Sequence, residues 1–171
     1  VSRRESFEII LEKYDGTMSE EEKERYTTEK NEIYKELLKN MSPADLAPEV
    51  KATMDELRKR GLKLAIGSSS KNAGFILGQL GLGDYFDAVS DGNQITRSKP
   101  DPEVFLLAAK LIDEKPEDCL VVEDARAGLA AAKAGGMTGA GIGDAADCEL
   151  ADYHLRTFQD LLTATHLSAC N

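Results

Sequence analysis

Two stretches of the chain differ in the spacing of their hydrophobic residues. Over residues 1–45 these residues recur at helical spacing, first from Phe7 to Tyr14 and then from Tyr26 to Leu38. From residue 46 onward, short apolar runs alternate with helical patterns. We therefore predict a small helical cap domain over 1–45 and an α/β core domain over 46–171. Strands that alternate with helices are typical of a Rossmann-like, doubly wound parallel sheet.

Cap and turn residues indicate where these elements begin and end. Ser19 and Glu22 have the spacing of a capping box, and Gly61 and Gly81 follow helical patterns. Asp101 followed by Pro102 predicts an N-cap and a first helical residue. The core is predicted to contain helices over 49–60, 72–80, from 101, over 125–134 and from 158, and strands over 62–66, 87–90, 119–122, 137–142 and 153–154.

Charge and composition narrow the class of protein. The net charge of −10 should repel nucleic acid and anionic membranes, and we expect neither as a partner. The densest apolar stretch, Val104–Ile112, is interrupted by Lys110 and is too short to span a bilayer. No amino-terminal signal pattern is present. The three cysteines include no CxxC pair, which fits a reducing cytoplasmic compartment, and we expect a monomer.

A serine-rich loop follows the first predicted strand of the core. Gly67 is followed by Ser68, Ser69, Ser70, Lys71 and Asn72, directly before a helix. Hydroxyl groups, a lysine and the free N–H groups of a helix start can bind a phosphate. An ordinary serine-rich turn with one serine as N-cap is the alternative, and the loop alone does not decide between them.

A lysine and a pair of acids follow two later strands. Lys99 precedes Pro100, and a lysine held in place there can neutralise a phosphoryl group, although a surface lysine fits as well. Glu123 and Asp124 end a wholly apolar strand. Such carboxylates can hold Mg²⁺, although Asp124 could instead be a helix N-cap. Because each group follows a strand of one parallel sheet, together they indicate phosphoryl transfer.

These motifs resemble those of the haloacid dehalogenase (HAD-like) superfamily, and in particular its β-phosphoglucomutase branch. The loop 68–72 resembles the second motif of the superfamily, 98–102 the third, and Glu123–Asp124 with Ala127–Gly128 the fourth. The segment 1–6 resembles the part of the cap that contacts a sugar phosphate, and 42–45 resembles the return from cap to core. The resemblance covers nearly the whole chain.

The resemblance implies a role for each candidate residue. Ser68 and Lys99 would act on the phosphoryl group being transferred, with Ser69, and Glu123 and Asp124 would hold Mg²⁺. Lys30 would reach the sugar from the cap. The residues that would bind the non-reacting phosphate of the sugar are Arg3, Ser70, Lys71 and Asn72.

The first motif of the superfamily has no counterpart here. That motif carries two aspartates, the nucleophile and the general acid/base, at the end of the central strand. Asp15-Gly16-Thr17 follows a helical pattern and lacks an aspartate two residues earlier, so we reject it as the nucleophile. We expect the neighbouring strands to lack a shared partner.

The implied activity is the interconversion of β-glucose 1-phosphate and glucose 6-phosphate, with sugar phosphates as substrates. It would proceed through an aspartyl-phosphate and glucose 1,6-bisphosphate, with Mg²⁺ as cofactor. Two alternatives remain open. One is a sugar-phosphate phosphatase on the same scaffold, and the other is a sugar-phosphate-binding protein without catalysis.

Overall fold

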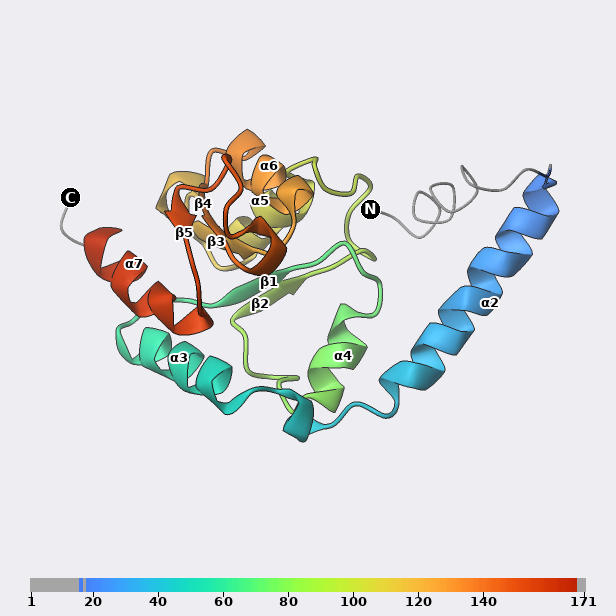
Figure 1. Cartoon of the computed structure of the whole chain (residues 1–171), viewed down its shortest axis with the longest axis horizontal. Helices are drawn as coiled ribbons and strands as arrows, with labels where there is room; N and C mark the ends of the chain where they lie inside the picture. The colour runs from blue at the N-terminus through green and yellow to red at the C-terminus, as the bar shows by residue number, and fades with distance from the viewer. Residues whose placement is uncertain (1–15, 17, 169–171) are drawn as a thin grey trace.

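The computed structural model describes residues 16 and 18–168, with side chains as far as Thr165. The first predicted helix, Arg3 and the rejected Asp15 lie outside the described residues. Helix α2, Glu20–Leu38, extends to one side of the α/β part of the molecule (Figure 1). Its capping box is confirmed, because the Ser19 side chain accepts a hydrogen bond from the Glu22 N–H while the Glu22 side chain bonds back to the Ser19 N–H.

The α/β part follows the predicted alternation, with helix ends within a few residues of those expected from the sequence. The left-handed conformations of Gly61 and Gly81, with φ of 84° and 72°, follow α3 and α4. The helices are α3 Pro48–Lys59, α4 Ala73–Gln79, α5 Glu103–Leu111, α6 Arg126–Ala134 and α7 Leu161–Ser168. The strands are β1 Ala65–Gly67, β2 Ala88–Ser90, β3 Leu120–Glu123, β4 Thr138–Gly141 and β5 Tyr153–His154.

One helix start differs from its prediction. Helix α5 begins at Glu103, with Pro102 in the N-cap position, rather than at Pro102 after an Asp101 cap. The Asp101 carboxylate still accepts a hydrogen bond from the Glu103 N–H at 3.0 Å. The carboxylate therefore caps the helix from one residue farther out than the sequence pattern indicated.

The described strands form two separate parallel sheets. One pairs β1 with β2, and the other has the order β3-β4-β5. Ala65 lies beside Ala88 in the first sheet, and Leu120 lies beside Thr138 in the second. No described strand pairs with both β1 and β3. Each of these two strands therefore has one paired edge and one edge without a partner strand in the described part of the chain.

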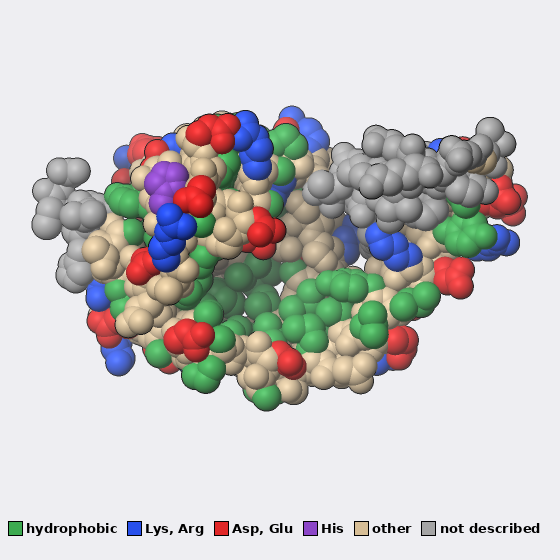
Figure 2. All heavy atoms as spheres, viewed as in Figure 1, with side chains coloured by type: hydrophobic (Ala, Val, Ile, Leu, Met, Phe, Trp, Pro, Cys, Tyr) green, Lys and Arg blue, Asp and Glu red, His purple; other side chains and the backbone are tan. Residues whose placement is uncertain are grey.

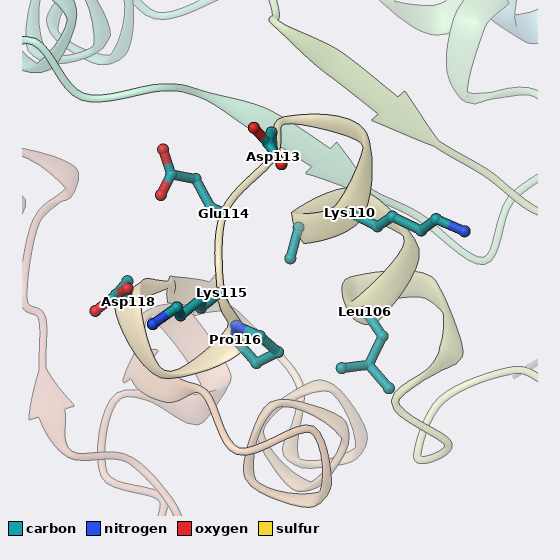
Figure 3. A pocket seen from close by; sticks show the side chains of 8 residues that line it. Leu106, Lys110, Asp113, Glu114, Lys115, Pro116 and Asp118 are labelled. Atoms are coloured by element: carbon teal, nitrogen blue, oxygen red, sulfur yellow. The ribbon is translucent and has the colours of Figure 1, made fainter.

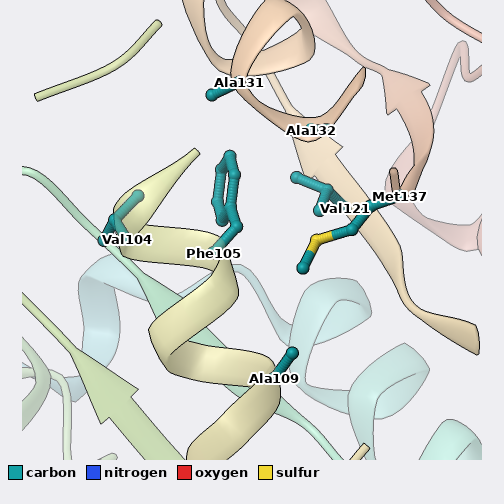
Figure 4. Close-up of a cluster of buried hydrophobic side chains, with 7 residues drawn as sticks. All are labelled: Val104, Phe105, Ala109, Val121, Ala131, Ala132 and Met137. Atoms are coloured by element: carbon teal, nitrogen blue, oxygen red, sulfur yellow. The ribbon is translucent and has the colours of Figure 1, made fainter. Parts of the chain in front are cut away.

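Helices on both faces join the two sheets. On one face, Phe105 of α5 packs with Val121 of β3 and Met137 in a buried cluster with residues of α6 (Figure 4). On the other face, Leu57 of α3 packs with Leu64, just before β1, and with residues of β3 and β4. Buried hydrophobic clusters thus lie on both faces of the strands. None of the described helices combines the length and apolarity needed to cross a bilayer.

The connection from α2 to the α/β part is tied to α4. The side-chain nitrogen of Gln79 lies 3.4, 3.0 and 3.3 Å from the carbonyl oxygens of Leu38, Lys39 and Met41. These carbonyls lie at the end of α2 and just beyond it, and that of Leu38 also accepts a hydrogen bond from the Met41 N–H. The carboxyl end of α2 is therefore held in place by a side chain of the core.

The Phe105 side chain should be a major source of stability. We expect Phe105→Ala to lower the free energy of unfolding by about 3–5 kcal/mol, because it removes a buried ring that touches both sheets. Phe75→Ala is the matched control, since Phe75 is 44% exposed whereas Phe105 is 7% exposed. Urea unfolding followed by circular dichroism measures both variants. Equal losses would contradict the joining role of Phe105.

Candidate active site

The predicted phosphate loop, lysine and acids all lie at one edge of the strands. The strands are parallel within each sheet, so β1 and β2 end at one edge, and β3 and β4 end at one edge. The contact between Lys99 and Glu123 brings these two edges together. Residues 68–72 follow β1, Lys99 lies in the connection after β2, and Glu123 and Asp124 lie at the end of β3. This is the edge at which open parallel sheets bind ligands.

The serine loop is organised by its own hydroxyl groups. The Ser68 N–H donates to the Ser90 carbonyl at 2.9 Å, which ties the loop to the end of β2. The Ser68 and Ser70 hydroxyl oxygens accept bonds from the Ser70 and Asn72 N–H groups, at 3.2 and 3.1 Å. Both hydroxyls can still donate to a phosphate oxygen. The buried Ser69 and Ser90 hydroxyls have no hydrogen-bond partner among the described residues.

Lys99 and Glu123 form an ion pair across the two sheets. The Lys99 ammonium contacts the Glu123 carboxylate, and the side chains are 16% and 9% exposed. The ammonium also lies 4.5 Å from the centre of the Phe105 ring. A largely buried charge pair of this kind is fixed in position, since separating either partner would leave an unpaired charge. The sequence motifs imply separate roles for these residues and do not indicate their contact.

The connection that carries Lys99 is shaped by Glu103. The Glu103 carboxylate accepts hydrogen bonds from the Thr96 N–H at 3.1 Å and the Arg97 N–H at 2.7 Å. These backbone hydrogen bonds lower the pKa of Glu103, and the bond from Thr96 has the largest effect. An ionised Glu103 at the start of α5 therefore holds the segment that leads into Lys99.

A glycine makes room for the Glu123 carboxylate. A Cβ atom on Gly128 of α6 would lie 2.1 Å from the Glu123 carboxyl carbon. Only a residue without a side chain fits at that point. The Ala127–Gly128 part of the fourth motif thus has a physical explanation, because helix α6 and the carboxylate share the same space.

Asp124 differs from Glu123 in its surroundings. Asp124 is exposed, whereas Glu123 is buried. The described residues contain no group of three or more His, Cys, Asp or Glu side chains suited to a metal. Mg²⁺ needs only one or two protein carboxylates beside waters and phosphate, so the exposed Asp124 fits such an ion. The charge of Glu123 is already balanced by Lys99, so Glu123 would contact the ion while still paired with that lysine.

Helix α2 reaches the serine loop through Asn31. The Asn31 side-chain oxygen accepts a hydrogen bond from the Asn72 side chain at 3.4 Å, and Asn31 is only 6% exposed. Lys30 and Lys71 are both exposed. The sequence pointed to Lys30 but not to Asn31, since a short amide in a strongly polar helix gives no signal of its own. A buried polar residue in α2 is visible only in three dimensions.

One hollow among the described residues lies elsewhere. It has a volume of about 600 Å³ and lies where α5 ends and β3 begins, at the opposite end of the strands (Figure 3). Lys110, Asp113, Glu114, Lys115 and Asp118 line much of it, and the sticks of the acids and lysines point in different directions. Convergent polar groups are what define a binding site. We therefore place the candidate site at the carboxyl edge.

Comparison with known proteins identifies the family of the chain. Residues 2–136 match the family described as haloacid dehalogenase-like hydrolase. The chain is 36% identical over 167 residues to a β-phosphoglucomutase of Bacillus subtilis, covering 94% of this chain and 72% of that protein. It is 33% identical to a phosphorylated carbohydrates phosphatase of Thermotoga maritima, covering 80% of this chain and 62% of that protein.

A solved structure agrees with these sequence matches. The crystal structure of a β-phosphoglucomutase from Clostridium difficile superposes with a TM-score of 0.87 at 32% identity, over 98% of this chain and 77% of that one. The chain belongs to the haloacid dehalogenase-like hydrolase family. Within this family it resembles the β-phosphoglucomutase branch, as the motifs predicted.

The fit of Glu123 against Gly128 can be tested directly. We expect Gly128→Ala to lower the free energy of unfolding by about 1–3 kcal/mol, because the new methyl group displaces the carboxylate from Lys99. Gly78→Ala is the control, since nothing lies within 4 Å of a Cβ there and the residue is also helical. That change should raise stability slightly. If Gly128→Ala were as stable as the control, the shared-space argument would be wrong.

Proposed function

We propose that this protein interconverts β-glucose 1-phosphate and glucose 6-phosphate by phosphoryl transfer, with glucose 1,6-bisphosphate as intermediate. The observation that carries the proposal is the arrangement at the carboxyl edge. A lysine fixed by Glu123 lies at the same edge as a serine loop, and that loop is bonded to α2 through Asn31 and Asn72. The two β-phosphoglucomutase relatives are consistent with it.

The residues of the chain divide between two phosphates. Ser68 and Ser69 would donate hydrogen bonds to the phosphoryl group being transferred, and Lys99 would offset its negative charge. Ser70, Lys71 and Asn72 would bind the other phosphate of the sugar, close to the start of α4. Arg3, which lies outside the described residues, is proposed for the same phosphate. A sugar with a phosphate at each end needs both groups of residues.

Glu123 and Asp124 are the residues proposed to hold Mg²⁺. The ion would neutralise negative charge on the phosphoryl oxygens. The phosphoryl acceptor implied by the family is an aspartate of the first motif, and no residue of the described chain takes that place. Lys30 on α2 would contact the sugar. Closure of the cap over the sugar would exclude water and so favour transfer over hydrolysis.

A sugar-phosphate phosphatase is the second candidate, because the Thermotoga relative is named as a phosphatase of phosphorylated carbohydrates. The protein expressed from its own gene should be incubated with β-glucose 1-phosphate, Mg²⁺ and a trace of glucose 1,6-bisphosphate. Mutase activity predicts glucose 6-phosphate formed much faster than inorganic phosphate. Release of inorganic phosphate at least as fast as formation of glucose 6-phosphate would establish the phosphatase instead. If neither product formed, the result would indicate a binding protein.

The proposed metal ligand gives one prediction. Asp124→Ala should reduce Mg²⁺-dependent turnover at least about 100-fold, since it removes the exposed carboxylate best placed for the ion. Asp147→Ala is the control, because Asp147 is a similarly exposed acid that pairs with Arg156 at 3.2 Å. Steady-state assays across Mg²⁺ concentrations measure both. Retained activity in Asp124→Ala would remove this residue from the metal site.

The proposed second phosphate site gives another prediction. Lys71→Ala should lower kcat/KM for the sugar phosphate about 10- to 100-fold by removing a charged hydrogen bond. The same change should alter hydrolysis of p-nitrophenyl phosphate less than about threefold, since that ester has one phosphate. Lys71 is exposed, so the fold should tolerate the change. Arg3→Ala should show the same contrast, and equal losses on both substrates would count against a second phosphate site.

A further inference from the structure

Beyond the ends of β1 and β2, the two parts of the chain continue side by side. The Ser68 N–H donates to the Ser90 carbonyl at 2.9 Å, and the Gly92 N–H donates to the Ser70 carbonyl at 3.2 Å. Both strands end on the side of the α/β part that faces α2 (Figure 1). The serine loop is therefore bonded to residues 90–93, which we call the support segment.

Gly92 brings the support segment into direct contact with the serine loop. A Cβ atom on Gly92 would lie 2.4 Å from the Ser69 carbonyl oxygen, 3.0 Å from the Lys71 backbone nitrogen and 3.1 Å from Lys71 Cγ. Two of these three atoms belong to the backbone, which cannot turn aside as the end of a side chain can. Only glycine permits so close an approach, and any side chain at this position would displace the loop at Lys71.

Asn93 adds a side-chain hydrogen bond at the same place. Its amide nitrogen donates to the Lys71 carbonyl at 3.1 Å. The Asp91 carboxylate accepts hydrogen bonds from this amide nitrogen at 3.1 Å and from the Asn93 N–H at 2.8 Å, and so holds the amide in place. The Lys71 backbone is thus fixed by a bond and by packing, whereas its side chain is exposed.

The support segment holds residues proposed for both phosphates of the sugar. It bonds to the N–H of Ser68, which is proposed for the transferred phosphoryl group, and to the carbonyl of Lys71, which is proposed for the second phosphate. Two residues bonded to one short segment keep a constant separation. The support segment therefore sets the distance between the two phosphates that the site can accept.

A lysine fixed in advance is valuable in a chain with a net charge of −10. On the face shown in Figure 2, Lys and Arg side chains are scattered among Asp and Glu side chains rather than gathered into one patch. An anion therefore meets no broad positive surface on this face. A single ammonium binds an anion more tightly when the backbone that carries it is already ordered, because less freedom is lost on binding.

We propose that Gly92 and Asn93 are positioning residues for the second phosphate of the sugar, and that they act by holding Lys71. The inference rests on the proposed function for the identity of the ligand. Both residues lie between the motifs at 68–72 and 98–102, and a Gly-Asn pair after a strand looks like an ordinary turn. Their contact with Lys71 is visible only in three dimensions.

Binding of glucose 6-phosphate in the presence of Mg²⁺, measured by isothermal titration calorimetry on the protein expressed from its own gene, tests this proposal without turnover. We expect Asn93→Ala to weaken binding about tenfold, because Lys71 is no longer held in advance. In a Lys71→Ala background the same change should weaken binding less than about twofold, since the residue through which Asn93 acts is absent. Asn93→Asp keeps the shape but loses the N–H donor, and it should behave like Asn93→Ala.

Asn40→Ala is the control, since Asn40 is also exposed but lies just beyond α2, outside the support segment. It should bind as the unchanged protein does. Equal losses from Asn93→Ala in the two backgrounds, or no loss in either, would overturn the proposal, as would an unchanged protein that binds no glucose 6-phosphate. If the coupling between Asn93 and Lys71 is found but no mutase activity is, only the proposed function is wrong. If the mutase is active without this coupling, only the positioning role is wrong.

Discussion

The ion pair between Lys99 and Glu123 is the contact on which the candidate site depends. It joins the connection after β2 to the end of β3, and so links two sheets that share no strand among the described residues. Both side chains are largely buried, and loss of one would leave the other charged and without its partner. The surrounding residues are arranged to permit this contact. Gly128 leaves space for the carboxylate, and Phe105 lies beneath the ammonium.

The same pair limits what each residue can do in catalysis. A lysine that already has a carboxylate partner contributes a local charge close to zero until an anion arrives. A phosphoryl group would then compete with Glu123 for the ammonium. The exposed Asp124 is free of that competition, which is why the two neighbouring acids are proposed to approach Mg²⁺ unequally. Two residues that are adjacent in sequence thus have different electrostatic surroundings.

Much of the fold could be predicted from local sequence because the ends of its helices carry strong local signals. Gly61 and Gly81 end helices by adopting positive φ, and Ser19 begins one by capping it. The order of the chemical groups along one edge followed from the parallel arrangement. The Lys99–Glu123 contact could not be predicted, since it joins residues 24 apart through the packing of α5 and α6. Asn31 was missed for a related reason, because its burial depends on where α2 lies.

Helix α4 links α2 to the serine loop. Its first turn follows the serine loop, and near its end Gln79 lies within hydrogen-bonding distance of three carbonyls at the end of α2 and just beyond it. A helix of seven residues is only about 10 Å long. Helix α4 therefore ties the base of α2 to the serine loop, and the Asn31–Asn72 bond ties a second point farther along α2 to the same loop. The long helix is held at two points by one short one, so its tilt is set by the position of the loop.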